Sequence, residues 1–597
     1  MKKRIADIMM ETLVNFGVTD CFGVVGGGAM HLDNALALNK NIHPYFNHNE
    51  QASAMAAEAY ARVSGRCAAV CVTSGPGATN AITGVAGAWQ DSIPLIVLSG
   101  QVRHDLSIDA SGLPLRYRGP QEFDIIPSVK NMTKYAVRLT DPLSACYELE
   151  KAWFIAMEGR RGPVWVDVPL NIQSAQVEES ELRHFDFAQQ KTKGECSVED
   201  IAFVKESLCS AQRPVILAGS GIVSAGQQEA FEKFVDLMGV PVVGGAHIGE
   251  NFYNEHPNYF GLSGDVGPRA GNFILQNADV ILVLANSLGF RQTGYMQEGF
   301  APHAKIIMVD IDANEAAKPG LHVNRFVHAD IKDFFAIMLE SGESVAVDRG
   351  WLAYCEDLWK RFDLYEGARG HSEASERVSS YYFWKVYDEL APQDNILCLG
   401  CNSACTGKVQ IGKRFKDQRI ITNYTIGSLG SDLPYSIGAA VASKKPVTCV
   451  TGDGGIMFNL QELQTIRHYG LPVNVIMFSN GGYNAIRQTG KNFFNGVWIG
   501  CTPETGISFP AARDLAHTFG FEYRHCENNG EVAENLSYIF SAGHPVLLEV
   551  EQRYDDPVAP KLQSRMREDG TFESPVLHDM SPFLADDELA SLMLWDK

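Results

Sequence analysis

The feature that most constrains the fold is a series of short apolar segments that alternate with helical stretches along the chain. Most of these segments are apolar at nearly every residue, which is typical of parallel strands covered on both faces. Their alternation with helices predicts βαβ units, and hence an α/β protein with doubly wound parallel sheets. The clearest predicted strands are Cys67–Thr73, Pro94–Ser99, Pro163–Val168, Pro214–Ala218, Val280–Ala285, Lys305–Ile311, Asn395–Leu399, Val447–Thr451, Val473–Phe478 and Val546–Val550.

Polar stretches divide the chain into three blocks. Its 597 residues exceed what one hydrophobic core supports, so several domains are expected. We predict domains over 1–175, 195–340 and 375–555, followed by a proline-containing tail over 556–597 that wraps over the surface. The first and third blocks are candidates for similar folds.

Composition excludes some classes of function. With 50 Lys and Arg against 71 Asp and Glu, the formal charge is −21, which argues against a general nucleic-acid or anionic-membrane binder. No apolar run reaches the length of a membrane helix, and the basic Met1–Arg4 is not followed by the apolar core of a secretory signal. The 13 cysteines, several of them within apolar segments, indicate reduced thiols and a cytoplasmic location.

A candidate metal site follows two predicted strands of the third block. Gly452-Asp453-Gly454 comes directly after one strand, and Asn480 follows the next strand, 27 residues beyond Asp453. Carboxyl ends of parallel strands share one sheet edge, where ligand sites lie. The oxygens of Asp453, Asn480 and the Gly482 carbonyl suit Mg²⁺, which completes its coordination with phosphate oxygens. Alone, Gly-Asp-Gly would indicate only a turn with Asp as N-cap; the spaced Asn480 favours the metal.

This pair resembles the signature of thiamine-diphosphate (ThDP) enzymes, and further motifs are similar to the acetolactate synthase family. These motifs are His48–Ala52, Ala59–Arg62, Thr73–Asn80, Gly159–Pro169, Phe300–Pro302, Val309–Asp312, Asn459–Leu463 and Leu471–Val473. The resemblance extends over residues 1–555, with the motifs in order. It implies pyrimidine-binding, central and diphosphate-binding domains, with ThDP between the first domain of one subunit and the third of another. A homodimer is then the minimum unit, and a tetramer is compatible with it.

The resemblance also assigns residues. It implies that the Glu50 carboxyl bonds the cofactor's pyrimidine ring and makes its amino group basic, whereas alone Glu50 could equally be a surface residue at a helix start. Gly27 and Gln121 are its other catalytic candidates. Its cofactor-binding candidates are Val25, Gly26, Pro76, Asn80, Gly400, Cys401, Asn402, Gly427, Leu429, Gly452, Asp453, Gly454, Gly455, Asn480, Gly482 and Tyr483.

Three positions depart from the family pattern. Cys401 and Asn402 stand where the family has Gln and His, and Leu429 stands where Met is commoner. The spacing of Cys398, Cys401 and Cys405 does not predict zinc, because no second cysteine pair or local histidine follows.

The family further implies FAD as a non-redox structural cofactor of the central domain. Its candidate ligands are Arg160, Gly219, Gly264, Arg291, Asp310 and Asp330. One departure counts against FAD: the family's Arg-Phe-Asp-Asp-Arg is Ser287–Arg291 here, so only the second arginine survives.

The leading functional hypothesis is a carboligase that decarboxylates pyruvate or a close 2-oxo acid and transfers the two-carbon unit to a carbonyl acceptor. Adjacent His-His, typical of simple 2-oxo acid decarboxylases, is absent from the sequence. Alternatives are a true acetolactate synthase of branched-chain amino acid synthesis, a flavin-dependent 2-oxo acid oxidase and a non-catalytic binding protein.

Two departures predict an acceptor bulkier than pyruvate, such as the nucleotide-linked keto sugars used by the yersiniose-branch type of enzyme. An extra segment around His104–Gly119, with Arg103, Arg116 and Arg118, suits phosphate or carboxylate recognition. Thr489 stands where acetolactate synthases have Trp, which opens the acceptor pocket. The alternative is a plain surface loop and a tolerated substitution.

Overall fold

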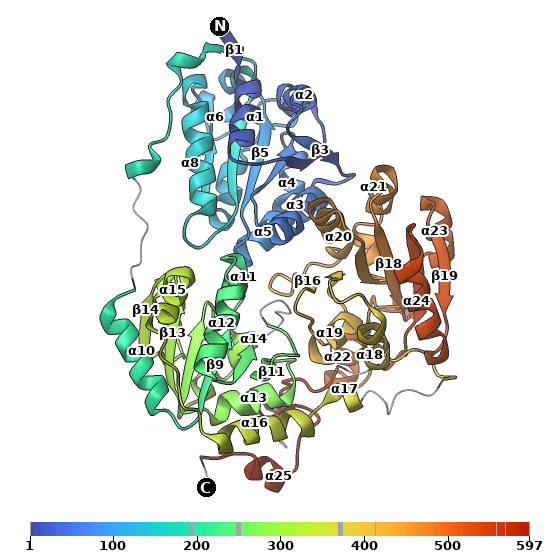
Figure 1. Ribbon diagram of the computed structural model, residues 1–597. Helices are drawn as coiled ribbons and strands as arrows, with labels where there is room; N and C mark the ends of the chain where they lie inside the picture. Colours follow the sequence, from blue (N-terminus) through green and yellow to red (C-terminus); the bar gives the residue numbers. More distant parts are fainter. Residues whose placement is uncertain are drawn as a thin grey trace.

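The computed structural model describes residues 2–189, 196–245, 252–367, 374–411, 413–556, 558–566 and 569–595. Three six-stranded parallel sheets, each flanked by helices, form three lobes (Figure 1). This confirms the predicted α/β class with doubly wound parallel sheets. Within the described residues, no helix combines the length and the apolar character needed to cross a bilayer.

The first sheet has the order β3-β2-β4-β5-β7-β6. Helices α1 and α8 cover one face of this sheet, and α3 and α5 cover the other. Its strands are β2 (Asp20–Gly23), β3 (His43–Phe46), β4 (Ala68–Val72), β5 (Leu95–Gln101), β6 (Tyr135–Arg138) and β7 (Val164–Pro169). The helices of this lobe are α1 (Ile5–Asn15), α2 (Met30–Leu38), α3 (Glu50–Ser64), α4 (Pro76–Asn80), α5 (Ile82–Gln90), α6 (Ile108–Ser111), α7 (Ile125–Val129), α8 (Ala145–Met157) and α9 (Leu170–Gln173). A two-stranded sheet pairs β1 (Lys2–Arg4) with β8 (Gln176–Glu178).

The third sheet, β16-β15-β17-β18-β20-β19, repeats this topology. Numbered along the chain, both sheets have the strand order 2-1-3-4-6-5, so the first and third blocks do have similar folds. The strands are β15 (Ile396–Leu399), β16 (Arg419–Ile421), β17 (Val447–Gly452), β18 (Val473–Ser479), β19 (Glu522–Cys526) and β20 (Val546–Glu551). The helices are α18 (Ser380–Leu390), α19 (Ser403–Ile411), α20 (Asp432–Ser443), α21 (Glu462–Tyr469), α22 (Asn484–Phe493), α23 (Ala512–Phe519) and α24 (Val532–Ser541).

The central sheet has a different order, β11-β10-β9-β12-β13-β14, which is 3-2-1-4-5-6 along the chain. That order is typical of dinucleotide-binding folds, whose ligand lies where the strand order reverses, here between β9 and β12. The strands are β9 (Pro214–Ala218), β10 (Val242–Gly244), β11 (Tyr259–Leu262), β12 (Val280–Leu284), β13 (Lys305–Asp310) and β14 (Arg325–His328). The helices are α10 (Val198–Ser210), α11 (Gly221–Ser224), α12 (Gln228–Met238), α13 (Arg269–Asn277), α14 (Phe290–Thr293) and α15 (Ile331–Ser341), with α16 (Arg349–Arg361) and α17 (Leu364–Gly367) after them.

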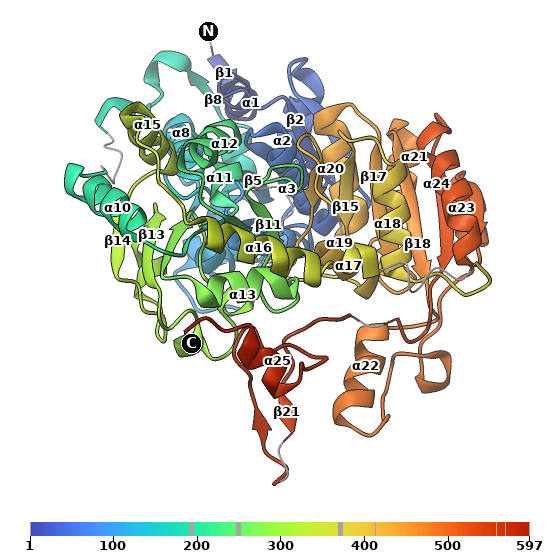
Figure 2. The ribbon, with the colours of Figure 1, turned by 60° about the horizontal axis from the view of Figure 1, so that its bottom comes forward.

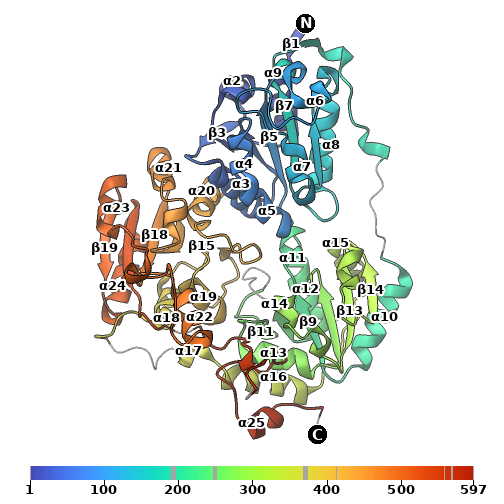
Figure 3. The same cartoon turned by 180° about the vertical axis from the view of Figure 1, so that it is seen from behind.

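The first and third lobes share one hydrophobic core through α3 and α20, which lie side by side (Figures 1 and 3). The two helices meet at backbone distance, because a Cβ on Gly438 would lie 1.9 Å from the Ala56 carbonyl oxygen. The Tyr435 hydroxyl also donates to the buried Glu58 carboxylate at 2.8 Å. These contacts fix how the two lobes sit relative to each other.

The C-terminal tail returns to the central lobe rather than only crossing the surface. It carries the hairpin β21 (Arg565–Met566) and β22 (Phe572–Glu573) and the helix α25 (Asp586–Ser591). Leu577 and Leu592 are buried in the core of the central lobe. Their carbonyls accept from Asn272 and Asn277 of α13 at 3.1 and 3.0 Å. The hairpin and α22 project from the molecule in Figure 2.

Candidate active site

The predicted residues of the first lobe gather where β2, β3, β4 and β5 end. Glu50 opens α3 behind Asn49, whose side chain caps the helix. The Glu50 carboxyl is buried, and its Oε2 accepts from Asn80 Nδ2 at 3.0 Å. A buried acid with a single amide partner is therefore held at the start of the helix rather than solvated on its surface.

Close backbone packing shapes this part of the site. The Gly28 N–H donates to Thr73 Oγ1 at 2.9 Å, and a Cβ on Gly26 would come within 2.5 Å of the Thr73 side chain. A Cβ on Gly77 would lie 2.7 Å from that side chain and 3.3 Å from Glu50 Oε1. The glycine loop and the Pro76 turn therefore enclose Thr73 beside Glu50.

The remaining candidates of this lobe line the same region. Gln121 has a φ of +59°, and its carbonyl oxygen would be 2.6 Å from a Cβ on Gly75. Its side chain is exposed, as is that of Val25, and Gly27 faces open space. The structure thus brings Val25, Gly26, Gly27, Glu50, Pro76, Asn80 and Gln121 together; their roles stay predictions.

In the third lobe, Asp453 joins the ends of two neighbouring strands. Gly452 and Phe478 are paired across β17 and β18, so the 27-residue spacing does place both strand ends at one edge. Asp453 Oδ2 accepts the backbone N–H groups of Asn480, Gly481 and Gly482 at 3.0, 2.7 and 3.3 Å, and Oδ1 accepts that of Gly454 at 2.8 Å. Burial raises the pKa of Asp453, while these four donors stabilise its charged form.

The other predicted residues of this lobe surround that turn. A Cβ on Gly454 would lie 2.3 Å from the Tyr483 ring, and one on Gly452 would lie 3.8 Å from Asn402. A Cβ on Gly427, which has a φ of +66°, would lie 3.8 Å from Cys401 Sγ. One on Gly400 would meet the buried Asp432 carboxyl at 2.2 Å. Leu429 is half-buried, and Gly455 is buried beside Gly452.

Cys398 lies in β15, and Cys401 and Cys405 follow this strand. Among the described residues, these three cysteines are not part of any cluster with convergent ligand atoms. Burial raises the pKa of the thiols of Cys401 and Cys405 and so favours their protonated form.

The candidates of the central lobe follow the carboxyl ends of its strands. Gly219, Gly264, Arg291 and Asp330 come after β9, β11, β12 and β14, and Asp310 is the last residue of β13, so they share one sheet edge. A Cβ on Gly219 would lie 2.0 Å from the Ala285 carbonyl oxygen at the reversal point. Burial raises the pKa of Asp310 to about 6. Asp330 caps α15, and Gly264, with a φ of +112°, is held by Asn272.

Arg160 links the first lobe to this edge. Its guanidinium donates to Asp312 at 3.1 Å and also to Glu315. At the same edge, Lys318 donates to Glu315 and to the Ser287 carbonyl. A lysine therefore contacts Ser287, the residue that stands in place of the family's first arginine.

Comparison with known proteins decides the family. Three models match: the N-terminal TPP-binding domain of thiamine pyrophosphate enzymes over residues 3–125, their central domain over 201–337 and their C-terminal TPP-binding domain over 400–550. The "Probable acetolactate synthase 2, chloroplastic" of Oryza sativa subsp. japonica is 30% identical over 94% of this chain and 84% of its own length. The "Acetolactate synthase large subunit" of Buchnera aphidicola is 28% identical over 82% and 84%. The chain belongs to the ThDP-dependent acetolactate synthase family.

The protein is therefore a ThDP-dependent carboligase, and its third lobe offers a donor set that fits Mg²⁺ and a diphosphate. Asp453, Asn480 and Gly482 present a carboxylate, an amide oxygen and a carbonyl at one turn. Asn480 Oδ1 accepts from Arg487 at 2.9 Å, and the same guanidinium binds the Asn480 carbonyl at 3.0 Å. An ion bound to Oδ1 would compete with Arg487 for this oxygen.

One buried residue of this acetolactate synthase-like site, Glu462, was given no role by the sequence analysis. Glu462 of α21 is fully buried and accepts from Asn47 Nδ2 at 2.8 Å and from the His48 N–H at 3.0 Å. It thereby holds the loop that precedes Glu50. Sequence showed Glu462 only as part of a family motif, because its partners lie more than 400 positions away.

Proposed function

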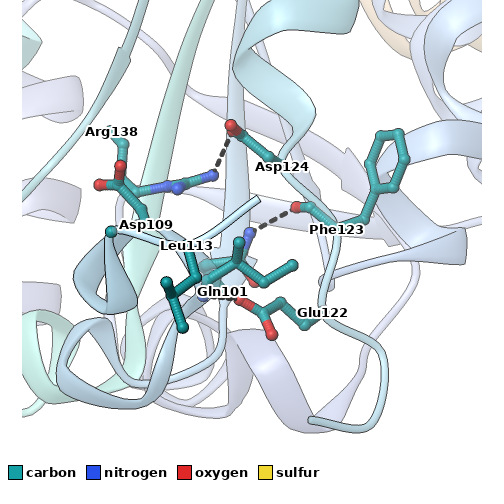
Figure 4. Close-up of a pocket in the computed structure, with 9 residues that line it drawn as sticks. Gln101, Asp109, Leu113, Glu122, Phe123, Asp124 and Arg138 are labelled. Carbon is teal, nitrogen blue, oxygen red and sulfur yellow. Dashed lines mark hydrogen bonds and ion pairs between the residues drawn. The ribbon is translucent and has the colours of Figure 1, made fainter. Parts of the chain in front are cut away.

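We propose that this carboligase transfers the two-carbon unit of pyruvate, or of a close 2-oxo acid, to a carbonyl acceptor bulkier than pyruvate, such as a nucleotide-linked keto sugar. The observation that carries the proposal is a cavity of about 220 Å³ between the extra segment and the strand ends beside Gln121 (Figure 4). Ile108, Asp109, Gly112 and Leu113 of the segment line this cavity together with Glu122. The part that the segment takes in lining this cavity supports a role in acceptor binding over a plain surface loop.

The residues of the first lobe have definite tasks in this proposal. When bound, ThDP would supply a nucleophilic carbon that adds to the donor carbonyl, so that the donor carboxylate can leave as CO₂ and the two-carbon unit can pass to the acceptor. Glu50 would share a proton with the pyrimidine ring, and Asn80 holds the carboxyl that would do so. The glycine backbone at 26–28 allows close approach, and Gln121 lies next to the substrate. Asp453, Asn480 and Gly482 would hold Mg²⁺ and, through it, the diphosphate.

The chemistry of the cavity favours an acceptor rich in hydroxyl groups. Its charged lining consists of Asp109, Glu122, Asp124 and Arg138, and Arg138 is already paired with Asp124 at 2.7 Å and with Asp167 at 2.8 Å. Carboxylates accept hydrogen bonds, and the hydroxyls of a sugar donate them.

The arginines of the segment are less available than the sequence suggested. Arg103 pairs with Asp105 at 2.9 Å, and Arg118 donates to the carbonyls of Asp105 and Ser107. Arg116 is exposed and makes no hydrogen bond or ion pair within the described residues. We assign recognition of a nucleotide phosphate to Arg116 alone.

Thr489 supports a wide acceptor path from a different part of the chain. It lies exposed on α22, where its hydroxyl bonds the Ala485 carbonyl at 3.0 Å. Helix α22 projects from the third lobe, whereas the extra segment belongs to the first. We therefore place Thr489 opposite the cavity of a second subunit, in a homodimer as the minimum unit.

The proposed FAD site is the edge of the central sheet. The dinucleotide-type strand order and the close approach of Gly219 to Ala285 support it. We propose a structural, non-redox flavin there. Purified protein without flavin absorbance, fully active without added FAD, would contradict this.

Three further expectations stay proposals. The domain limits are 1–175, 195–340 and 375–555, each of which encloses one of the three sheets, with 556–597 as the tail. A cytoplasmic location rests on the cysteines, since all 13 are free thiols. The dimer, or a tetramer built from it, rests on the family resemblance.

The experiment is a competition of acceptors. The enzyme receives pyruvate alone, then pyruvate with nucleotide-linked 4-keto sugars, and the products are identified by mass spectrometry. We expect a two-carbon adduct of the sugar, with KM for the sugar raised in Asp109→Asn and Arg116→Ala. Arg103→Ala is the matched control, because Arg103, unlike Arg116, already pairs with an acid, Asp105.

Two alternatives have distinct outcomes. Rapid acetolactate formation from pyruvate, unaffected by any such sugar, would restore the synthase of branched-chain amino acid synthesis. Oxygen consumption with pyruvate would instead indicate a flavin-dependent oxidase.

A further inference from the structure

A second cavity, of about 260 Å³, lies on the opposite face of the first sheet from Glu50. It is bounded by α1, α8 and the segment 179–187, which crosses both helices. Helices α1 and α8 pack on one face of this sheet, whereas α3, which begins with Glu50, packs on the other. This cavity therefore has no part in the ThDP chemistry.

Three ligand-type side chains converge in this cavity. Cys146 and Glu150 lie four residues apart on α8 and so share one face of the helix. His184 of the crossing segment completes the group, with its Nδ1 2.7 Å from Glu150 Oε1. The donor atoms of all three lie within 4.8 Å of one another, and within the described residues no other group of three does so.

The crossing segment is anchored in a way that positions His184. The Phe185 N–H donates to Glu150 Oε2 at 2.7 Å. The Phe185 ring packs on Phe154 at 5.6 Å, and the Phe187 ring packs on Phe16 at 6.1 Å between centroids. His184 is therefore held over Cys146 and Glu150 by contacts on its C-terminal side.

The dimensions suit a small transition-metal ion. Zinc binds thiolate at about 2.3 Å and imidazole or carboxylate at about 2.0–2.2 Å in tetrahedral geometry, so its ligand atoms are about 3.3–3.6 Å apart. A small side-chain rotation brings the three donors to such distances. Thiolate together with imidazole favours zinc-type ions over Mg²⁺ and Ca²⁺, which prefer oxygen ligands.

The surrounding charge also favours a cation. Glu11 and Glu179 line the cavity in addition to Glu150, and Lys3, which pairs with both, offsets them only in part. Burial raises the pKa of the Cys146 thiol, with a further contribution from these carboxylates. A bound metal ion would displace the thiol proton, as metal binding to cysteine does in general.

We propose that Cys146, Glu150 and His184 form a binding site for a divalent transition-metal ion of the zinc class. The cavity leaves room for a water molecule as the fourth ligand. Bound there, the ion would fasten the segment 179–187 to α8 in addition to the hydrogen bonds of His184 and Phe185 to Glu150 and the packing of Phe185 on Phe154.

The test uses the full-length protein after chelation and dialysis, titrated with Zn²⁺ and, separately, with Co²⁺. We expect one equivalent to bind, a cobalt–thiolate charge-transfer absorption, and a rise of Tm with Zn²⁺. His184→Ala should weaken Zn²⁺ binding by about 100-fold or more, since even residues behind the ligands contribute about 10-fold to 100-fold. Cys146→Ser should abolish the cobalt–thiolate band.

Matched variants separate this site from others. Cys209→Ser removes an exposed thiol on α10 and should change nothing. Asp453→Ala should retain the cobalt–thiolate band, which distinguishes this site from that of Mg²⁺. His184 is largely exposed, with 61% of its side chain accessible, so its alanine variant folds even if the cysteine variant does not. Absence of the cobalt–thiolate band in the wild type, or equal Zn²⁺ affinity in His184→Ala, would overturn the proposal.

Discussion

Removing the Glu462 carboxylate should destabilise the loop at Asn47 and His48, which precedes Glu50. In the structure this carboxylate accepts from Asn47, His48 and Thr465 at 2.8, 3.0 and 2.8 Å. Glu462→Ala leaves the buried Asn47 amide without its acceptor and the His48 N–H only partly reachable by water. An unsatisfied buried donor costs about 1–3 kcal/mol, so we expect unfolding to require about 2 kcal/mol less.

Glu462→Gln should cost much less, for a reason visible in the structure. Asn47 Oδ1 is buried without a partner, so rotating the Asn47 amide by half a turn lets it accept from the new glutamine. One good hydrogen bond then replaces another. We expect a loss below about 1 kcal/mol, within the usual net value of a single hydrogen bond.

Activity separates positioning from stability. A misplacement of about 1 Å near reacting groups can cost about 100-fold in rate, so Glu462→Ala should lower kcat by about 10-fold to 100-fold at saturating ThDP. Glu462→Gln should stay near the wild type. The measurements are urea unfolding and steady-state product formation from pyruvate.

The matched control is Thr465→Val. It removes one hydrogen bond to the same carboxylate but leaves both bonds to the loop, so kcat should be preserved. A Glu462→Ala enzyme with wild-type kcat would refute the positioning role, and so would a Thr465→Val enzyme that loses as much activity.

Four other variants test the site and its electrostatics. Asp453→Ala should abolish Mg²⁺-dependent retention of ThDP, measured by calorimetry, but it also removes the acceptor of four backbone N–H groups. Asn480→Ala should abolish ThDP retention while leaving that acceptor in place. Unchanged ThDP affinity in both variants would refute the assignment. Glu50→Gln should bind ThDP but lose most activity, seen as slow exchange of the ThDP C2 proton by NMR; a wild-type exchange rate would remove Glu50 from the mechanism. Burial raises the pKa of Asp432 from 3.8 to about 6, so the folded state holds this proton more tightly. The stability it contributes is fully present below about pH 3.8 and is lost as pH rises through about 6. At about 1.4 kcal/mol per pH unit, the shift corresponds to about 3 kcal/mol of unfolding free energy. In Asp432→Asn, urea unfolding at a series of pH values should not show this loss of stability. Parallel pH profiles of the wild type and the variant would contradict the assignment.

The sequence predicted the centre of each sheet better than its edges. All ten of the clearest predicted strands occur. The strands β3, β6, β11, β14, β16 and β19 at the edges, and β2 and β10 next to them, were not among these ten. These strands are short, and several carry polar residues, such as Arg524 and His525 in β19. An edge strand is less covered than a central one, so its sequence carries a weaker apolar signal.

The same contrast applies to the site. Asp453 and Asn480 were predicted to meet because consecutive parallel strands are adjacent and end at one edge, which is a local property of the sequence. Glu462 and Arg487 could not be found in this way. Their roles depend on which side chains the packing of α20 and α21 brings near the first lobe, and on how α22 turns back towards Asn480.

The repeated topology of the first and third lobes bears on where a complete site can form. Helix α3 follows the second strand of its sheet and α20 follows the second strand of the other, so equivalent helices pack on each other within the chain. Among the described residues, no hydrogen bond or ion pair joins the first-lobe candidates around Glu50 to the third-lobe candidates around Asp453. Suppose that each site takes Glu50 from one subunit and Asp453 from the other. A dimer of one Glu50→Gln subunit and one Asp453→Ala subunit then has one site with both substitutions and one site with neither. Co-expression with two affinity tags and purification of the mixed dimer should then restore activity that neither variant has alone. A mixed dimer as inactive as both parents would show that each site lies within a single chain.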